Sequence, residues 1–169
     1  MQEKQDKQKA TLSNRRKFVN VSDVKYGDPL IGRFINSIMW DGKKSIAEKI
    51  VYKALDLTKE NETIPKEMNQ VELFRKIVGK IKPIVEVVSR RVRGATYPVP
   101  SEVRNSRAEM LALRWLKQGA KARGREMYKA LSKELLDAYN DTGFAIKKRT
   151  DLHSMAKASR AFSHLNSPR

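Results

Sequence analysis

The residues of this sequence that could carry covalent or metal chemistry are few and poorly spaced. Its two histidines, His153 and His164, lie eleven positions apart, and the chain contains no cysteine. Neither a zinc site nor a Cys-His nucleophile can be assembled from these residues. Acids between positions 28 and 74 are interleaved with lysines at helical spacing, as on a solvated face. No positive argument for catalysis follows, and we expect neither an enzyme nor a bound metal or cofactor.

The segment DGKKS at positions 41–45 resembles the end of a phosphate-binding loop. That motif needs a glycine five residues before its second glycine, where this chain has Ser37, and it follows a strand. Apolar residues before position 41 repeat at helical spacing instead. An interhelical turn is therefore the preferred interpretation, with nucleotide hydrolysis as the weaker alternative.

Basic side chains are concentrated in the middle of the chain. Residues 75–125 hold fourteen lysines and arginines against three acids, a net +11 of the chain's +17. Charge placed in this way is the electrostatic footprint of a nucleic-acid binder, because each neutralised phosphate releases counterions. A merely solvated surface would show mixed signs. The distribution therefore indicates a polyanionic partner.

The elements that must position this charge follow from periodicity and from helix-breaking residues. We expect a mainly α single domain of about six helices with one protruding two-stranded antiparallel β-ribbon. A basic, disordered arm is predicted at residues 1–23, the helical RNA-binding domain at 24–165, and a tail at 166–169. The first helix begins at Asp28-Pro29, the last begins near Lys147, and Gly143 ends the helix before it.

The ribbon is predicted over residues 84–103, which are rich in β-branched residues and have Gly94 at the turn. Pro98 and Pro100 are two positions apart, so their missing N–H groups fall on the same edge, which stays unpaired. The ribbon should pack its base on the helices and project its arginines. Most aromatic residues, Trp40 among them, lie on or beside apolar faces and are expected to pack in the core; Tyr97, in the ribbon, is the exception.

Several blocks of sequence carry a resemblance to a known family. They are FIN at 34–36, MWDGKKSIA at 39–47, VEV at 85–87, SRRV at 89–92, ALRW at 112–115 and AIKKR at 145–149, followed by His153 and FSH at 162–164. From about residue 24 to 165 the chain resembles the family of the seventh protein of the bacterial-type small ribosomal subunit. It differs from the family pattern at Arg93, where glycine is usual, and at Pro98, where glutamine is usual.

The resemblance implies a helical domain with a β-ribbon that binds the three-prime major domain of small-subunit ribosomal RNA and nucleates assembly of the head. It also implies neighbouring proteins of the head and platform, exit-site tRNA and mRNA as partners, no membrane, and a place on the ribosome of a bacterial cytoplasm or an organelle matrix. Residues expected near tRNA and mRNA are Arg93, Tyr97, Arg160 and His164.

From charge and placement together, we expect ribosomal RNA to be bound by an arm, a ribbon, a helix face and the start of the last helix. An architectural DNA-binding protein, whose β-arms would enter a minor groove with a proline wedge, is the alternative. An enzyme acting on RNA lacks an identifiable general base. The expected rRNA-binding residues are Arg15, Arg16, Lys17, Lys25, Lys43, Lys44, Arg90, Arg91, Arg93, Arg104, Arg107, Arg114, Lys117, Lys121, Lys147, Lys148 and Arg149.

Overall fold

The computed structural model of the chain describes residues 22–65, 67–124 and 126–166. It forms two compact units, Met1–Lys49 and Ile50–Arg169. The described residues contain six α-helices and one two-stranded antiparallel sheet, which confirms the predicted fold class. No described helix is long and apolar enough to cross a membrane. The predicted arm and tail lie outside the described residues, except for positions 22, 23 and 166.

The first unit contains α2 (Pro29–Ile38), whose start follows from the local sequence. Oδ1 of Asp28 accepts hydrogen bonds from the N–H groups of Leu30 (2.6 Å) and Ile31 (3.2 Å), so Asp28 caps the helix as predicted. Proline at the first helical position removes an N–H group that would have no helical partner. The apolar side chains of the pattern are buried: Ile31, Phe34, Ile35 and Ile38.

A tight turn leads from α2 into α3 (Lys44–Lys59). Asp41 and Gly42 have φ values of 50° and 73°, and the N–H of Lys43 donates to the carbonyl of Trp40 at 3.0 Å. Positive φ at both central residues identifies a type I′ turn, for which Asp-Gly is a favoured pair. The predicted interhelical turn is confirmed, and the phosphate-loop alternative is wrong because a helix precedes this segment.

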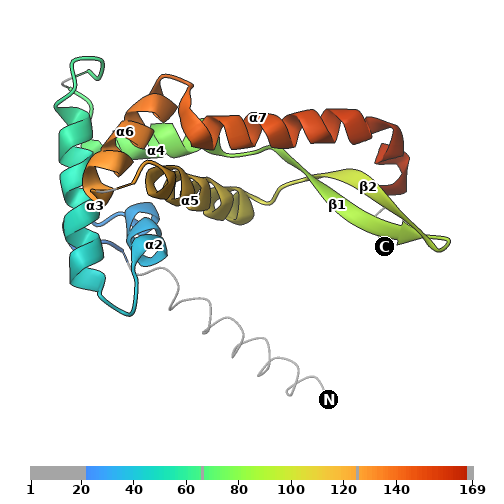
Figure 1. Ribbon diagram of the computed structural model, residues 1–169, viewed down its shortest axis with the longest axis horizontal. Coiled ribbons are helices and arrows are strands. Elements are labelled where there is room, and N and C mark those ends of the chain that lie inside the picture. Colours follow the sequence, from blue (N-terminus) through green and yellow to red (C-terminus); the bar gives the residue numbers. More distant parts are fainter. Residues whose placement is uncertain (1–21, 66, 125, 167–169) are drawn as a thin grey trace, which may run out of the picture. The chain divides into compact units, whose positions relative to one another are not determined.

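Four helices of the second unit pack around a common core. They are α4 (Gln70–Ile81), α5 (Asn105–Ala122), α6 (Met127–Tyr139) and α7 (Gly143–Ala158). α5 contacts the other three, and α4 also contacts α6 and α7. Figure 1 shows α7 continuing past the end of α5 and along the ribbon. The largest fully buried side chains of these helices are Leu73, Phe74, Ile77, Ile81, Leu116, Leu131, Leu135 and Glu134.

The ribbon consists of β1 (Val85–Val92) and β2 (Ala95–Glu102), within the predicted range. Arg93 and Gly94 form its two-residue turn with φ values of 50° and 90°. Arginine in this left-handed conformation is strained, because its Cβ crowds the backbone. The 3₁₀ helix η1 (Ser159–Asn166) contacts β2, and α7 contacts β1 (Figure 1).

The structure differs from the prediction in the residue that caps α6 and in the start of α7. α6 ends at Tyr139, and Asp141 with φ 58° takes the left-handed position that Gly143 was expected to fill. α7 then begins at Gly143, four residues before Lys147. The helix can start early because a distant acceptor exists: Oε1 of Glu134 accepts the N–H of Ala145 at 2.9 Å.

Glu134 is a carboxylate with no exposed surface, placed where α5, α6 and α7 meet. Besides the Ala145 N–H, it accepts a hydrogen bond from Nε of Arg123 (3.0 Å) and forms an ion pair with Nη2 of Arg123 (2.9 Å). Arg123 also bonds Asp137. Burial lowers the pKa of Arg123, but the bonds to Asp137 and Glu134 outweigh it, so the pKa of the guanidinium is raised. Gly119 of α5 leaves the space that this carboxylate occupies.

Candidate RNA-binding surface

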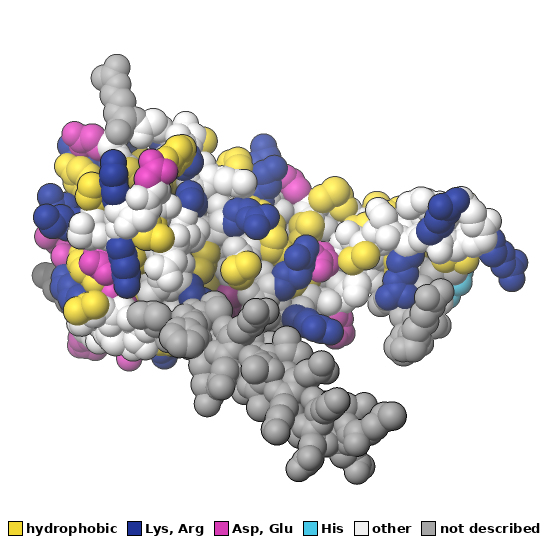
Figure 2. Space-filling model, turned by 90° about the horizontal axis from the view of Figure 1, so that it is seen from below, with side chains coloured by type: hydrophobic (Ala, Val, Ile, Leu, Met, Phe, Trp, Pro, Cys, Tyr) yellow, Lys and Arg dark blue, Asp and Glu magenta, His cyan; other side chains and the backbone are white. Residues whose placement is uncertain are grey.

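Three arginines lie at the free end of the ribbon, on both of its faces. Arg90 is paired with Tyr97 and Arg91 with Thr96, so the two arginine side chains leave opposite faces, because successive strand residues alternate. Arg91 and Arg93 are exposed, and Arg90 is half-buried. Figure 2 shows basic side chains at this end of the molecule and no acidic one at the tip on the face in view. The tip is therefore a concentrated positive feature.

The ribbon keeps its ladder intact despite two prolines in β2. Pro98 lies opposite Ser89, and Pro100 lies opposite Val87. Hydrogen-bonded and non-bonded pairs alternate along such a hairpin, starting from a bonded pair beside the turn. Both prolines fall at non-bonded pairs, so their nitrogen atoms face the outer edge. The register thus confirms the sequence-based prediction that the two missing donors lie on the same, outer edge.

Contacts with the C-terminal elements hold the ribbon. The ring of Tyr97 on β2 lies 5.4 Å from that of Phe162 on η1, at an interplanar angle of 41°. At the base, the N–H of Ile84 donates to Nε2 of His153 on α7 at 3.2 Å. The aromatic ring at position 97 is therefore half-buried against the chain's own end.

The residues expected near tRNA and mRNA lie on the ribbon and η1. Arg93 is at the turn, Tyr97 is on β2, and Arg160 and His164 are exposed on η1, which contacts β2. Nδ1 of His164 lies 3.0 Å from the carbonyl oxygen of Ala161. Three of the four residues are thus on two adjoining elements, and the fourth is at the tip.

One face of α5 carries a row of basic side chains. Arg114, Lys117 and Lys121 follow one another at helical spacing; the first and third are exposed and the second is half-buried. Burial, followed by repulsion from Lys121, lowers the pKa of Lys117. An anion bound on this face would relieve that repulsion.

At the start of α5, two residues, Arg104 and Arg107, are expected to contact RNA, and the structure gives them different surroundings. Arg104 is exposed at the position before the helix. Nε of Arg107 forms an ion pair with Glu86 of β1 at 2.8 Å. Sequence spacing puts Arg107 on the basic face, but the structure shows that part of its charge is already balanced by the ribbon.

The start of α7 supplies a third basic group. Lys147 and Lys148 are exposed, and Nζ of Lys148 lies 5.5 Å from the centre of the Phe144 ring. Arg149 is half-buried and donates a hydrogen bond to the carbonyl of Lys80 on α4. Arg149 therefore ties α7 to α4 as well as adding charge.

A basic cluster beside this group was missed by the sequence analysis. Nζ of Lys76 and Nζ of Lys80, both on α4, lie 5.2 Å and 5.3 Å from the centre of the Tyr139 ring on α6. Lys80 also forms an ion pair with Asp141 at 2.7 Å. The spacing of four residues between the lysines was visible in the sequence, but their common aromatic partner comes from a distant helix.

In the first unit, the expected contact residues lie in two places. Nζ of Lys25 is 4.9 Å from the centre of the Tyr26 ring. Lys43 is the last residue of the type I′ turn and Lys44 follows it, with Nζ of Lys44 3.8 Å from Oε1 of Glu48. The predicted contacts Arg15, Arg16 and Lys17 lie outside the described residues.

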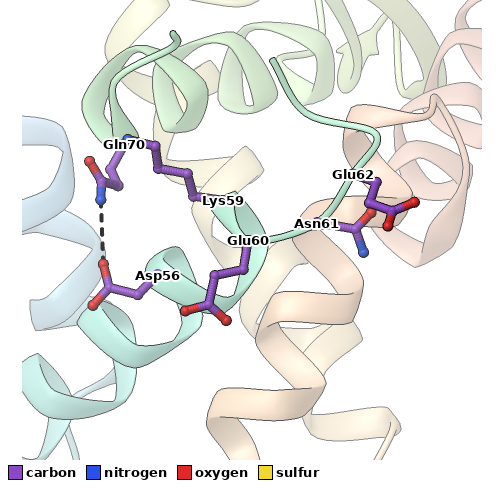
Figure 3. A pocket seen from close by; sticks show the side chains of 6 residues that line it. All are labelled: Asp56, Lys59, Glu60, Asn61, Glu62 and Gln70. Atoms are coloured by element: carbon purple, nitrogen blue, oxygen red, sulfur yellow. Dashed lines mark hydrogen bonds between the residues drawn. The ribbon is translucent and has the colours of Figure 1, made fainter. Parts of the chain in front are cut away.

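In contrast to these basic surfaces, an open hollow of about 600 Å³ between α3 and α4 is lined by acidic side chains. Figure 3 shows Asp56, Glu60 and Glu62 around it, with Nε2 of Gln70 donating to Asp56 at 3.5 Å. This region would repel phosphates. Within the part of the chain that the structure describes, no three His, Asp or Glu side chains are grouped to hold a metal ion.

Comparison with known proteins matches residues 7–160 to the family model of ribosomal protein S7p/S5e. Relatives named small ribosomal subunit protein uS7 include that of Methylobacterium nodulans, 51% identical over 85% of this chain and 90% of the relative. That of Petrotoga mobilis is 52% identical over 85% and 91%, and that of Thermotoga neapolitana 50% identical over 84% and 90%. The chain therefore belongs to the ribosomal protein S7p/S5e family, which confirms the resemblance noted from its sequence blocks.

Proposed function

We propose that this protein is a structural, non-enzymatic component of the small ribosomal subunit that binds ribosomal RNA of the head, or three-prime major, domain and nucleates head assembly. Family membership supports the ribosomal role, with RNA and other subunit proteins as partners. The finer assignment rests on one observation: exposed cations extend from three separate elements of the second unit, the ribbon tip, α5 and the start of α7.

Phosphate contacts position a protein on folded RNA, and cations on several rigid elements can hold more than one RNA helix. The ion pair between Arg107 and Glu86 joins the base of the ribbon to α5 and so helps to keep these two elements rigid relative to each other. In the same proposal the ribbon and η1 reach exit-site tRNA and mRNA through Arg93, Tyr97, Arg160 and His164. The acidic hollow between α3 and α4 lies outside this surface.

The alternative of an architectural DNA binder is weakened by the position of the prolines. In such a binder, an apolar wedge such as proline enters between base steps. Arg93 and Gly94 form the tip here, while Pro98 and Pro100 lie on the side of β2. The ribbon therefore presents charge at its end.

Competition binding tests the proposal. The protein should prefer a head-domain ribosomal RNA fragment to bent duplex DNA of equal length by a wide margin. Replacing Arg90 and Arg91 by Ala should lower the slope of log affinity against log salt by about one for each phosphate that is no longer neutralised. Lys59→Ala, which removes one charge at the acidic hollow, is the control and should leave the slope unchanged. Equal affinity for duplex DNA would refute the RNA assignment.

A further inference from the structure

Among the residues that the structure describes between positions 22 and 49, Trp40 is the largest exposed apolar side chain. It shows 66% of its surface to solvent, in contrast to Trp115, which shows 8%. The expectation that Trp40 packs in the core is wrong, because α2 ends at Ile38 and the residue lies beyond the apolar stripe. An indole in water is costly, since burying it would remove a large apolar area from solvent. An exposed aromatic ring of this size can serve as a stacking surface for a planar ligand.

The type I′ turn brings this indole beside a cation. Trp40 and Lys43 are its first and fourth residues, joined by the 3.0 Å hydrogen bond from N–H to carbonyl. The Cα atoms of these two positions in a β-turn lie within about 7 Å of each other. Both side chains are exposed. The turn therefore holds the backbone positions of an exposed aromatic residue and an exposed lysine close together.

The start of α3 adds positive potential at the same point. Lys44 is its first residue, and the first turn of the helix contains no acid. The N-terminal end of a helix already carries a partial positive charge, so lysines here oppose the usual preference for acids. Glu48 offsets part of the charge of Lys44 at 3.8 Å. The surroundings of the indole thus favour an anionic ligand.

We propose that Trp40 stacks on an unpaired base of the bound RNA while Lys43 contacts an adjacent phosphate. This inference rests on the proposed RNA-binding function and adds a base-stacking contact to it. An unpaired nucleotide fits because it has both a flat π-face and a charged backbone, whereas bases in a duplex are already stacked. A protein partner fits less well, because lysine is depleted from the cores of protein interfaces.

Loss of the stacking contact and loss of the phosphate contact should affect the salt dependence of RNA binding differently, so the two contacts can be tested separately. Trp40→Ala should weaken binding to a head-domain RNA fragment by about 5- to 150-fold, the range for removal of one base stack, without changing the salt slope. Trp40→Phe should retain part of the affinity. Lys43→Ala should lower the slope by about one. Leu57→Ala removes another exposed apolar side chain, on α3, and should change neither quantity.

Fluorescence gives an independent measurement on the unmodified chain. Stacking of a base on the exposed indole should quench the emission of the wild-type protein when RNA is added. Trp40→Phe, which leaves only the buried Trp115, should abolish most of that change. If Trp40→Ala binds RNA as tightly as wild type while Arg90 and Arg91 variants still weaken binding, the stacking proposal is overturned and the proposed function stands. If wild type shows no preference for RNA, the proposed function itself fails.

Discussion

Gly79 and Gly119 are both interior glycines of helices, yet replacement by Ala should change stability in opposite directions. A Cβ at Gly79 in α4 would meet nothing within 4 Å. Gly79→Ala should therefore gain the ordinary helix preference of about 0.5–1 kcal/mol. A Cβ at Gly119 in α5 would lie 2.6 Å from Cδ of Glu134 and 2.7 Å and 2.9 Å from its oxygens. Those separations are too short for any real contact.

The size of the destabilisation at Gly119 follows from what holds the Glu134 carboxylate. It is fully buried, it accepts hydrogen bonds from the Ala145 N–H at 2.9 Å and from Nε of Arg123 at 3.0 Å, and it forms an ion pair with Nη2 of Arg123. Moving it away lengthens those bonds, at about 1–3 kcal/mol for a buried group left unsatisfied, in addition to the strain of overpacking. After subtraction of the helix gain, Gly119→Ala should lower the free energy of unfolding by about 2 kcal/mol and Tm by about 4–8 °C.

Urea unfolding followed by circular dichroism measures both variants against wild type. A double variant, Gly119→Ala with Glu134→Ala, tests the cause. Glu134→Ala alone should cost about 3 kcal/mol, because the Ala145 N–H loses its acceptor and a cavity opens. With the carboxylate gone, the new methyl group has room, so the double variant should be no less stable than Glu134→Ala. Additive destabilisation, or equal stability of the two glycine variants, would refute this reasoning.

Two further predictions concern the ribbon. Burial, and then the charges of Arg149 and Lys157, lowers the pKa of His153, whose Nε2 accepts the Ile84 N–H. As the pH falls, the unfolded chain therefore binds a proton at this histidine before the folded chain does. The stability that neutral His153 contributes is fully present above the ordinary histidine pKa of about 6.5 and is lost as the pH falls below it. His153→Gln should flatten that part of a stability curve measured from about pH 7.5 to 5, and a wild-type curve already flat there would contradict the assignment. At the tip, Arg93→Asn should raise the free energy of unfolding by up to about 1 kcal/mol, since Asn tolerates positive φ, and lower the salt slope of RNA binding by about one. Arg93→Gly is the matched control, because it removes the charge and also the backbone strain at positive φ. If the salt slope of RNA binding is unchanged in both variants, the ribbon tip does not contact the RNA.

Local sequence signals were sufficient for much of the fold. Asp28 and Pro29 fixed the start of α2, and Asp41-Gly42 fixed the turn after it, because each acts through atoms a few residues away. The ribbon was predictable for a similar reason: Gly94 marks the turn, and proline spacing sets which pairs lack hydrogen bonds.

What the sequence could not supply depends on residues far along the chain. α7 begins early because Glu134 on another helix provides the acceptor. Arg107 looks like an open contact in the sequence, but its spacing on α5 contains no information about Glu86 on β1. Trp40 follows an apolar helix and so looks like a core residue, and only the position of the helix end shows that it faces water.

The contact between Tyr97 and Phe162 decides when, during synthesis, the ribbon can become fully supported. The two residues are separated by 65 positions, so their contact closes one of the longest loops in the second unit. A two-stranded ribbon is marginal without support. During synthesis, the ribbon strands emerge well before η1, and a nascent chain stopped before η1 would have the ribbon held at its base by α7 but without the contact between Tyr97 and Phe162. Emergence of η1 is therefore the step that completes the support of the ribbon, and a chain truncated before η1 would hold the ribbon only near its base.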